Sequence, residues 1–118
     1  PDITLVSRTE VGFAVTRAHH ADVGGAEPGS MPADSRTLAD EGVVIPPTRL
    51  DDELLDGLIA RMRNPEERRG DFRAQLAAHT LAERRLAELC ARRARHRVVA
   101  AMDELTRRAL RAGPTEST

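Results

Sequence analysis

Aromatic residues are nearly absent from the chain. Its 118 residues include no Trp, no Tyr and two Phe, Phe13 and Phe72. A core without aromatic rings is filled by Leu, Val, Ile, Ala and Met, which bury less surface per side chain. A domain of this length buries roughly two-thirds of the surface of its unfolded chain. The sequence therefore predicts a small core and a chain that packs against other protein.

Cysteine and lysine are also scarce. The single Cys90 excludes an internal disulfide and is typical of a reducing compartment, so a cytoplasmic location is expected. All 18 basic residues are Arg, and the net charge is −1. No overall field attracts nucleic acid or an acidic membrane, and no apolar run approaches the roughly 20 residues of a membrane span. Neither nucleic acid nor a membrane is expected as a partner.

The first 50 residues have the pattern of a β-rich segment. Residues 3–6 and 11–16 are apolar and β-branched, and Ser7–Glu10 is a plausible turn, which predicts a hairpin. Residues 18–40 are rich in Gly and Pro and show no periodicity. Loops of this length in small domains are commonly functional. Residues 43–45 predict a short strand that stops at two prolines.

Residues 51–112 have the pattern of helices. Asp51 or Asp52 can cap a first helix whose residues 54, 55, 58, 59 and 62 form an apolar face. Asn64 as N-cap and Pro65 at the first helical position predict a restart. The prediction is an α+β fold, part of a larger fold, with a hairpin, a short strand, a long active-site loop and two to three helices. Its segments are 1–50, 51–112 and a flexible tail, 113–118.

The loop after the second strand carries residue types that bind divalent metals, namely His19, His20 and Asp22. If the strand continues to His20, the two histidines point to opposite faces, and His19 converges with Asp22 where the chain turns. Glu41 is the nearest good third ligand. From spacing alone, a polar surface loop with a hydrogen-bonded histidine is the favoured interpretation, because such groupings are common.

Longer words in the sequence resemble a known family. The stretch "RAHHADVGGAEPGSMPADS" followed by "EGVVIPP" resembles the signature of the hydantoinase B/5-oxoprolinase family, and "NPEERRGDFRAQLAAHTLAERRLAEL" resembles its "TPEERLGDLRAQIAANRLGERRLLEL" helix. Two positions depart from the family words: the Asn of "AAN" is His79 here, and the Gly of "LGERR" is Ala82. The similarity runs in order from Pro1 to about Leu110, within subunits that are much longer.

The resemblance implies a role and a set of site residues. In the family, an A-type subunit binds ATP and activates a lactam or carbonyl oxygen, and the B-type subunit completes hydrolysis or carboxylation at a metal. Carried over, His19 and Asp22 are the metal ligands, with Glu41 or His20 in addition; the ion is Zn, Mn or Mg. Asp71, Arg73 and Gln75 of "GDFRAQ" could line the site as catalytic candidates, or could be solvated charges on a helix.

The resemblance leaves the function of this chain open between three alternatives. It is a metal-binding segment of an ATP-dependent cyclic amide hydrolase, a subunit of a related ketone carboxylase, or a catalytically silent segment kept for assembly. The expected partners are an A-type subunit, other segments of a split B subunit, or a second copy. ATP belongs to the partner, because "GGAEPG" lacks the Lys and Ser/Thr of a phosphate-binding loop.

Overall fold

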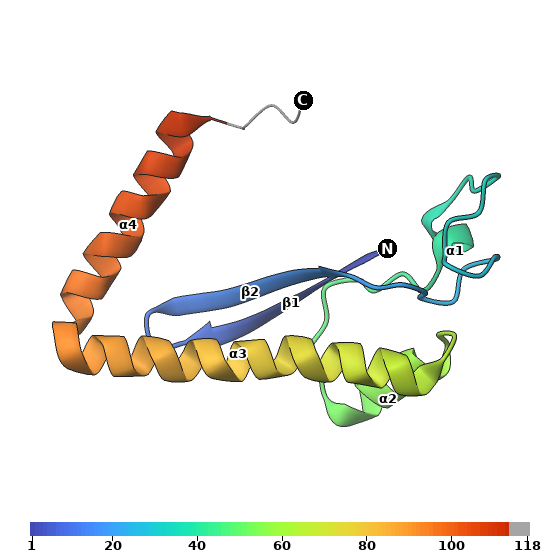
Figure 1. Ribbon diagram of the computed structural model, residues 1–118, viewed down its shortest axis with the longest axis horizontal. Helices are drawn as coiled ribbons and strands as arrows, with labels where there is room; N and C mark the ends of the chain where they lie inside the picture. The colour runs from blue at the N-terminus through green and yellow to red at the C-terminus, as the bar shows by residue number, and fades with distance from the viewer. Residues whose placement is uncertain (114–118) are drawn as a thin grey trace.

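The computed structural model describes residues 1–113. In chain order its elements are β1 (Asp2–Thr9), β2 (Gly12–His19), α1 (Leu38–Glu41), α2 (Asp52–Ala60), α3 (Pro65–Arg93) and α4 (Arg95–Ala112). The hairpin lies along the long helix α3, the 20–37 loop and α1 lie at one end, and α4 turns away at the other (Figure 1). The predicted α+β fold with helices after the hairpin is confirmed. Of the predicted tail, residues 114–118 fall outside the described part.

The hairpin is longer than the sequence predicted. The strands pair antiparallel from Asp2↔His19 to Thr9↔Gly12, so Glu10 and Val11 form the turn. The turn predicted at Ser7–Glu10 is therefore wrong, because Ser7 and Thr9 are paired strand residues. The inner face of the hairpin is partly polar, so a Ser in this stretch marks that face and not the turn.

A chain of polar side chains joins the inner face of the hairpin to α3. His20 donates from Nε2 to Oε1 of Gln75 at 2.9 Å. Gln75 Nε2 donates to the Thr16 hydroxyl at 3.3 Å and to the Ile3 carbonyl at 3.2 Å. His79 then bonds the hydroxyls of both strands, Thr16 at 2.8 Å through Nε2 and Ser7 at 2.7 Å through Nδ1. These side-chain hydrogen bonds, which leave only Nδ1 of His20 without a partner among the ring and amide nitrogens of the layer, fix the register of α3 on the hairpin.

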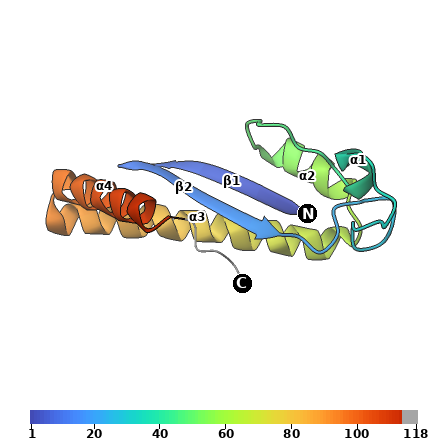
Figure 2. The same ribbon diagram turned by 90° about the horizontal axis from the view of Figure 1, so that it is seen from above.

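The apolar core is small and lies at the end of the hairpin nearest α2. Its buried members are Ile3, Val23, Leu58, Ile59, Met62 and Phe72. The predicted apolar face of α2 is confirmed, and Asp51 caps this helix by accepting from the Leu54 N–H at 2.8 Å. Figure 2 shows α2 and the hairpin side by side along α3. The core therefore forms where these three elements meet.

Of two further sequence predictions, the strand at residues 43–45 is wrong and the N-cap position of Asn64 is confirmed. Residues 43–45 form no strand within the described structure, where an isolated bridge joins Gly24 to Gly42. Asn64 occupies the N-cap position of α3 with φ 51°, and its side chain makes no capping bond. Pro65 begins the helix as predicted, because its fixed φ suits the first helical position.

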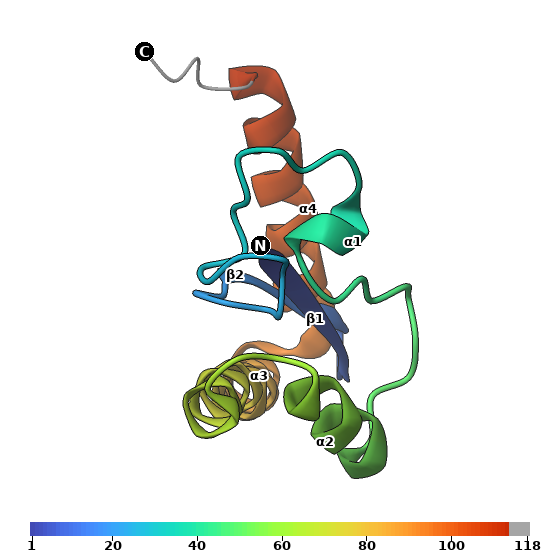
Figure 3. The same cartoon turned by 90° about the vertical axis from the view of Figure 1, so that its right-hand side faces the viewer.

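The molecule is open for its length. Its radius of gyration is 17.8 Å, whereas a compact domain of this length has about 13–14 Å. The outer face of the hairpin exposes Val6, Phe13 and Val15, which are each more than 60% exposed. Figure 3, an end-on view, shows this hairpin covered by α3 on one face only. No described helix is long and apolar enough to cross a membrane.

The link through His79 gives a first prediction. His79→Ala removes the partner of the half-buried Ser7 hydroxyl and one of the two partners of the Thr16 hydroxyl, at about 1 kcal/mol each, so we expect a loss of about 2 kcal/mol in the free energy of unfolding. Urea denaturation followed by circular dichroism measures it. His96→Ala, at an exposed position of α4, is the matched control, expected within about 0.5 kcal/mol of the parent. Equal midpoints for both variants would contradict the role of His79.

Candidate functional site

The loop after β2 is organised around the carboxylate of Asp22. Its oxygens accept from the Gly24 N–H at 2.9 Å, the Gly29 N–H at 2.7 Å and the Ser30 hydroxyl at 3.0 Å. The Asp22 side chain is 12% exposed. A short acidic side chain that accepts from the backbone ahead of it closes a tight turn. Asp22 therefore holds residues 22–30 in a closed turn.

Ser30 is the second centre of the same loop. Its hydroxyl donates to Asp22 and accepts from the backbone N–H groups of Val23 at 2.8 Å and Gly25 at 3.2 Å. Ser30 is 2% exposed and has a φ of 52°, a conformation that few residues other than Gly adopt. The strain is retained because three hydrogen bonds hold the residue in place.

Arg63, between α2 and α3, ties the loop to the helices. Its Nη1 lies 3.2 Å from Asp22 Oδ1 and donates to the Glu27 carbonyl at 2.8 Å, and its Nη2 donates to the Gly25 carbonyl at 2.7 Å. A planar guanidinium suits such a forked arrangement of acceptors. One side chain thus joins the helical half of the chain to the loop.

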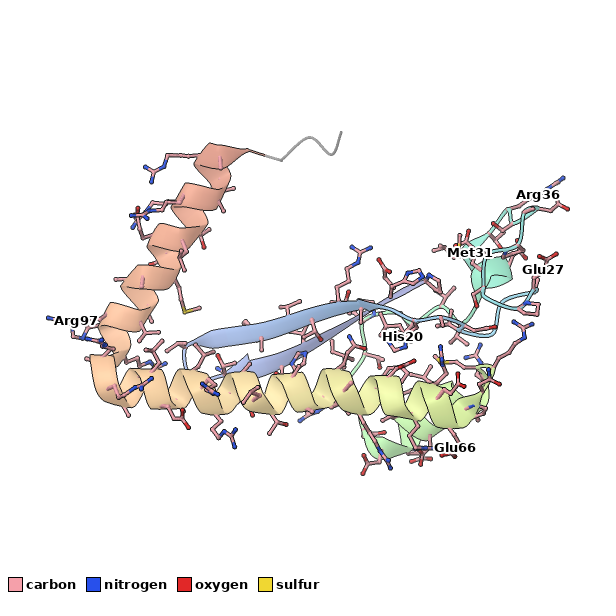
Figure 4. The ribbon with its side chains drawn as sticks, in the orientation of Figure 1. His20, Glu27, Met31, Arg36, Glu66 and Arg97 are labelled. Carbon is pink, nitrogen blue, oxygen red and sulfur yellow. The ribbon has the colours of Figure 1, made fainter. Side chains whose placement is uncertain are left out.

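The far side of the loop is joined to the segment around α1. Val43 N–H donates to the Val23 carbonyl and Ala26 N–H to the Asp40 carbonyl, each at 2.9 Å. Figure 4 shows His20 between the end of β2 and α3, whereas Glu27, Met31 and Arg36 lie at the outer end of the molecule. The loop is therefore anchored at its base and presents residues 26–29 and 31–37 outward.

The pKa of Asp22 follows from these contacts. Burial raises the pKa of its carboxyl, but the N–H groups of Gly29 and Gly24, the Ser30 hydroxyl and Arg63 outweigh burial and lower the pKa from 3.8 to about 2. The carboxylate form is therefore the form that the folded loop requires.

The lowered pKa predicts a loss of stability in acid. Because the folded state binds this proton less tightly than the unfolded state, the stabilisation of about 2 kcal/mol is complete above pH 3.8 and is lost as the pH falls through about 2. Denaturation midpoints measured at steps through this range should show that loss. Asp22→Asn removes the titrating group and should flatten this part of the profile. An unchanged profile in the Asn variant would contradict the assignment.

The predicted metal ligands have different partners in the structure. His19 is exposed, and its Nδ1 bonds Asp2 Oδ1 at 3.0 Å, whereas Glu41 accepts from the Ser35 hydroxyl at 2.9 Å. His20 is buried beside Phe72, with ring centroids 4.9 Å apart. Within residues 1–113, no three His, Cys, Asp or Glu side chains gather into a set that could hold a metal ion.

A divalent ion does not fit Asp22 in this arrangement. Both carboxylate oxygens already accept hydrogen bonds, and the Arg63 guanidinium occupies the adjacent position with a positive charge. A metal bound through Asp22 would have to displace Arg63 and the loop N–H groups. The metal set His19, Asp22, Glu41 and His20 stays a prediction.

Of the three catalytic candidates, Gln75 is turned inward. It is 7% exposed and bonds His20, whereas Asp71 is paired with Arg68 at 3.4 Å and Arg73 is exposed. The sequence interpretation missed Ser30 and Arg63, which complete the anchor. An Arg in the linker between two predicted helices gives no periodic signal, and its link to residue 22 depends on tertiary packing.

The chain shows clear similarity to known proteins. A family model described as hydantoinase B/oxoprolinase matches residues 1–114. An uncharacterised protein of Methanocaldococcus jannaschii is 35% identical over 85 residues, which are 67% of this chain and 15% of that protein. A 5-oxoprolinase of Dictyostelium discoideum is 32% identical over 90 residues, 67% of this chain and 7% of that protein.

A further relative is described as a subunit. The caprolactamase subunit beta of Pseudomonas jessenii is 32% identical over 101 residues, which are 80% of this chain and 17% of that protein. The chain thus spans a small part of the length of each of these relatives. No solved structure matches the chain significantly.

Proposed function

Because the chain belongs to the hydantoinase B/oxoprolinase family, we propose that it serves as a segment of a B-type subunit that takes part in hydrolysis of a cyclic amide of the 5-oxoproline or hydantoin type. The family match over residues 1–114 carries the proposal. Relatives described as 5-oxoprolinase and caprolactamase subunit beta support an amide as the substrate class.

The anchored loop is the part of this chain with a defined role in the proposal. Asp22, Ser30 and Arg63 hold the base of the loop, and residues 26–29 and 31–37 are then presented to the protein that lies beyond it. Since the Asp22 carboxylate is occupied by the loop itself, its role here is to fix the loop. Activation of the substrate belongs to an ATP-binding A-type partner, and the chain supplies a rigid wall of the shared site.

A chimeric subunit tests the proposal. The matched segment of the Pseudomonas jessenii caprolactamase subunit beta is replaced by residues 1–113, and caprolactamase activity is measured with the rest of that enzyme present. We expect activity above that of a subunit lacking the segment. Arg63→Ala should lower kcat in the chimera, and Arg97→Ala, at an exposed position of α4 away from the loop, is the matched control. A folded but inactive chimera would argue against the proposal.

The short coverage of each relative favours a second candidate, a catalytically silent segment that serves assembly. In that case the chimera assembles normally, and Arg63→Ala changes the yield of complex without changing kcat per complex. Size-exclusion chromatography with light scattering separates the two outcomes. The activity per assembled complex therefore decides between a wall of the active site and a segment that serves assembly.

The chain alone should not act on ATP. It carries no phosphate-binding loop sequence, and the proposed reaction depends on a separate ATP-binding subunit. We expect no release of phosphate from ATP by the purified chain above the buffer rate. Phosphate release that disappears in the Arg63→Ala variant would contradict this expectation, since a contaminating ATPase would not respond to that substitution.

A further inference from the structure

A large groove runs along the outer edge of β1. It has a volume of about 1310 Å³ and is lined on one side by residues 1–8 and on the other by residues 41–50. Its floor is apolar and includes Leu54, Leu58, Phe72 and Leu76. In the end-on view of Figure 3, the chain between α1 and α2 passes beside β1 without joining the sheet. The groove is therefore bordered by β1 and by a segment of backbone that belongs to no sheet.

The edge of β1 that faces this groove has free hydrogen-bonding groups. The Pro1 carbonyl accepts from the His20 N–H at 2.9 Å, and the register continues from Asp2↔His19. In an antiparallel pair, hydrogen-bonded and non-hydrogen-bonded residues alternate. Ile3, Leu5 and Ser7 therefore bond β2, while the N–H and C=O groups of Thr4, Val6 and Arg8 point toward the groove.

The opposite wall is a strand sequence without a strand partner. Residues 43–45, Val-Val-Ile, form no strand, and the Val43 N–H donates to the Val23 carbonyl at the start of the segment. Val43 and Ile45 pack against the core, whereas Val44 is 51% exposed. A run of β-branched residues that lies beside a groove without a pairing partner is typical of a strand whose neighbour is missing. A neighbouring strand that is absent from this chain would explain both the strand pattern of the sequence here and the unpaired state of the segment in the structure.

We propose that the groove receives an extended segment from the remainder of a hydantoinase B subunit, which pairs with the free edge of β1 and lies between β1 and residues 43–45. This inference rests on the proposed function. The relatives contain enough further chain to provide such a segment, since the matched part is 17% or less of their length. Two-stranded sheets are marginal on their own, and an unprotected edge of eight residues is a template for a further strand.

The shape of the groove selects a single strand over a second copy of this chain. The groove has a wall on each side, so the edge of another folded hairpin would have to fit a second strand and its side chains between the two walls. The apolar floor also favours a segment with alternating apolar residues, because one face of the inserted strand would lie on Leu58 and Phe72.

Hydrogen exchange in the chimeric caprolactamase subunit tests the pairing. In the isolated chain, the Thr4, Val6 and Arg8 amides should exchange quickly, while those of Ile3, Leu5 and Ser7 are protected. In the chimera, protection of the first three should rise by about 100-fold or more, as expected for ladder bonds. Mass spectrometry with residue-level fragmentation reads both states. A folded chimera whose Thr4, Val6 and Arg8 amides stay unprotected would overturn the proposal.

A matched pair of variants separates the backbone from the side chain. Val6→Pro removes the N–H that faces the groove, and Val6→Ala keeps it; both lose the exposed valine side chain. The two should be equally stable in the isolated chain, because Pro is tolerated at outward positions of edge strands. In the chimera, Val6→Pro should lower the yield of folded subunit at least tenfold relative to Val6→Ala. Equal yields would overturn the pairing.

The readouts are independent of catalysis. An inactive chimera with protected Thr4, Val6 and Arg8 amides would refute the proposed function and support the strand. An active chimera without that protection would do the reverse. If light scattering shows the isolated chain to be a dimer in which the Val6 amide is already protected, the occupant is a second copy, and the proposal is wrong.

Discussion

Asp22→Ala is expected to lower the free energy of unfolding by about 2–4 kcal/mol, because it leaves two loop N–H groups and the Ser30 hydroxyl without their acceptor and removes the charge that faces Arg63. The carboxylate is the shared acceptor of Gly24, Gly29, Ser30 and Arg63. Such a loss is a large share of the stability of a small domain. Denaturation by urea at neutral pH measures it.

The control is an acid in the same loop. Asp34 is exposed, so Asp34→Ala should stay within about 0.5 kcal/mol of the parent. A double-mutant cycle with Arg63→Ala then isolates the contact. The double variant should lose less than the sum of the single losses, because each single change already removes the Asp22–Arg63 bonds. Additive losses would show that the two side chains act independently, and the anchor as described would be wrong.

The helices α2 and α3 were predictable, and their starts follow from local signals. The apolar periodicity of α2, its Asp51 cap and Pro65 at the start of α3 are encoded within a few residues. The hairpin was also predictable, but its turn was not. Polar Ser7 packs inward on His79, so the polarity that suggested a turn is instead a tertiary contact.

The site illustrates the limit of spacing arguments. The sequence placed Asp22 in a functional loop, and the structure gives it partners within the loop and in the linker before α3. Residue type and spacing indicate that a carboxylate is needed, but they do not distinguish a metal from an Arg as the positive group beside it. Arg63 lies 41 residues from Asp22 in sequence, and such a pairing is fixed by packing alone.

His20 and Gln75 were both selected from the sequence, for different reasons, and the structure joins them. Their hydrogen bond of 2.9 Å spans 55 residues and belongs to the polar layer between β2 and α3. The two candidates thus form one structural unit at the base of the loop. Both residues lie in stretches that resemble the family signature, and their contact gives them a packing role. Activity measurements on the chimera can separate that packing role from a catalytic one.

The second large effect is expected at Gly24. Its φ is 81°, and a Cβ built there would collide with the Arg61 carbonyl. A backbone carbonyl at the end of α2 cannot move away without shifting Arg63 and the start of α3. We expect Gly24→Ala to cost about 2–5 kcal/mol, from roughly 1–2 kcal/mol of backbone strain and roughly 1–3 kcal/mol of overpacking. Denaturation midpoints and proteolysis of the loop measure it.

Gly29→Ala separates the two causes. Gly29 has nearly the same φ, 87°, but nothing lies within 4 Å of an added Cβ. It should therefore cost only the strain, roughly 1–2 kcal/mol. The difference between the losses of the two variants measures the cost of the steric clash between a Cβ at position 24 and the Arg61 carbonyl. If both variants lose the same amount, the close approach of Gly24 to Arg61 contributes nothing, and the loop is held by Asp22 and Arg63 alone. If Gly24→Ala alone exposes residues 22–30 to protease, the contact between this loop and α2 is what keeps the anchor closed.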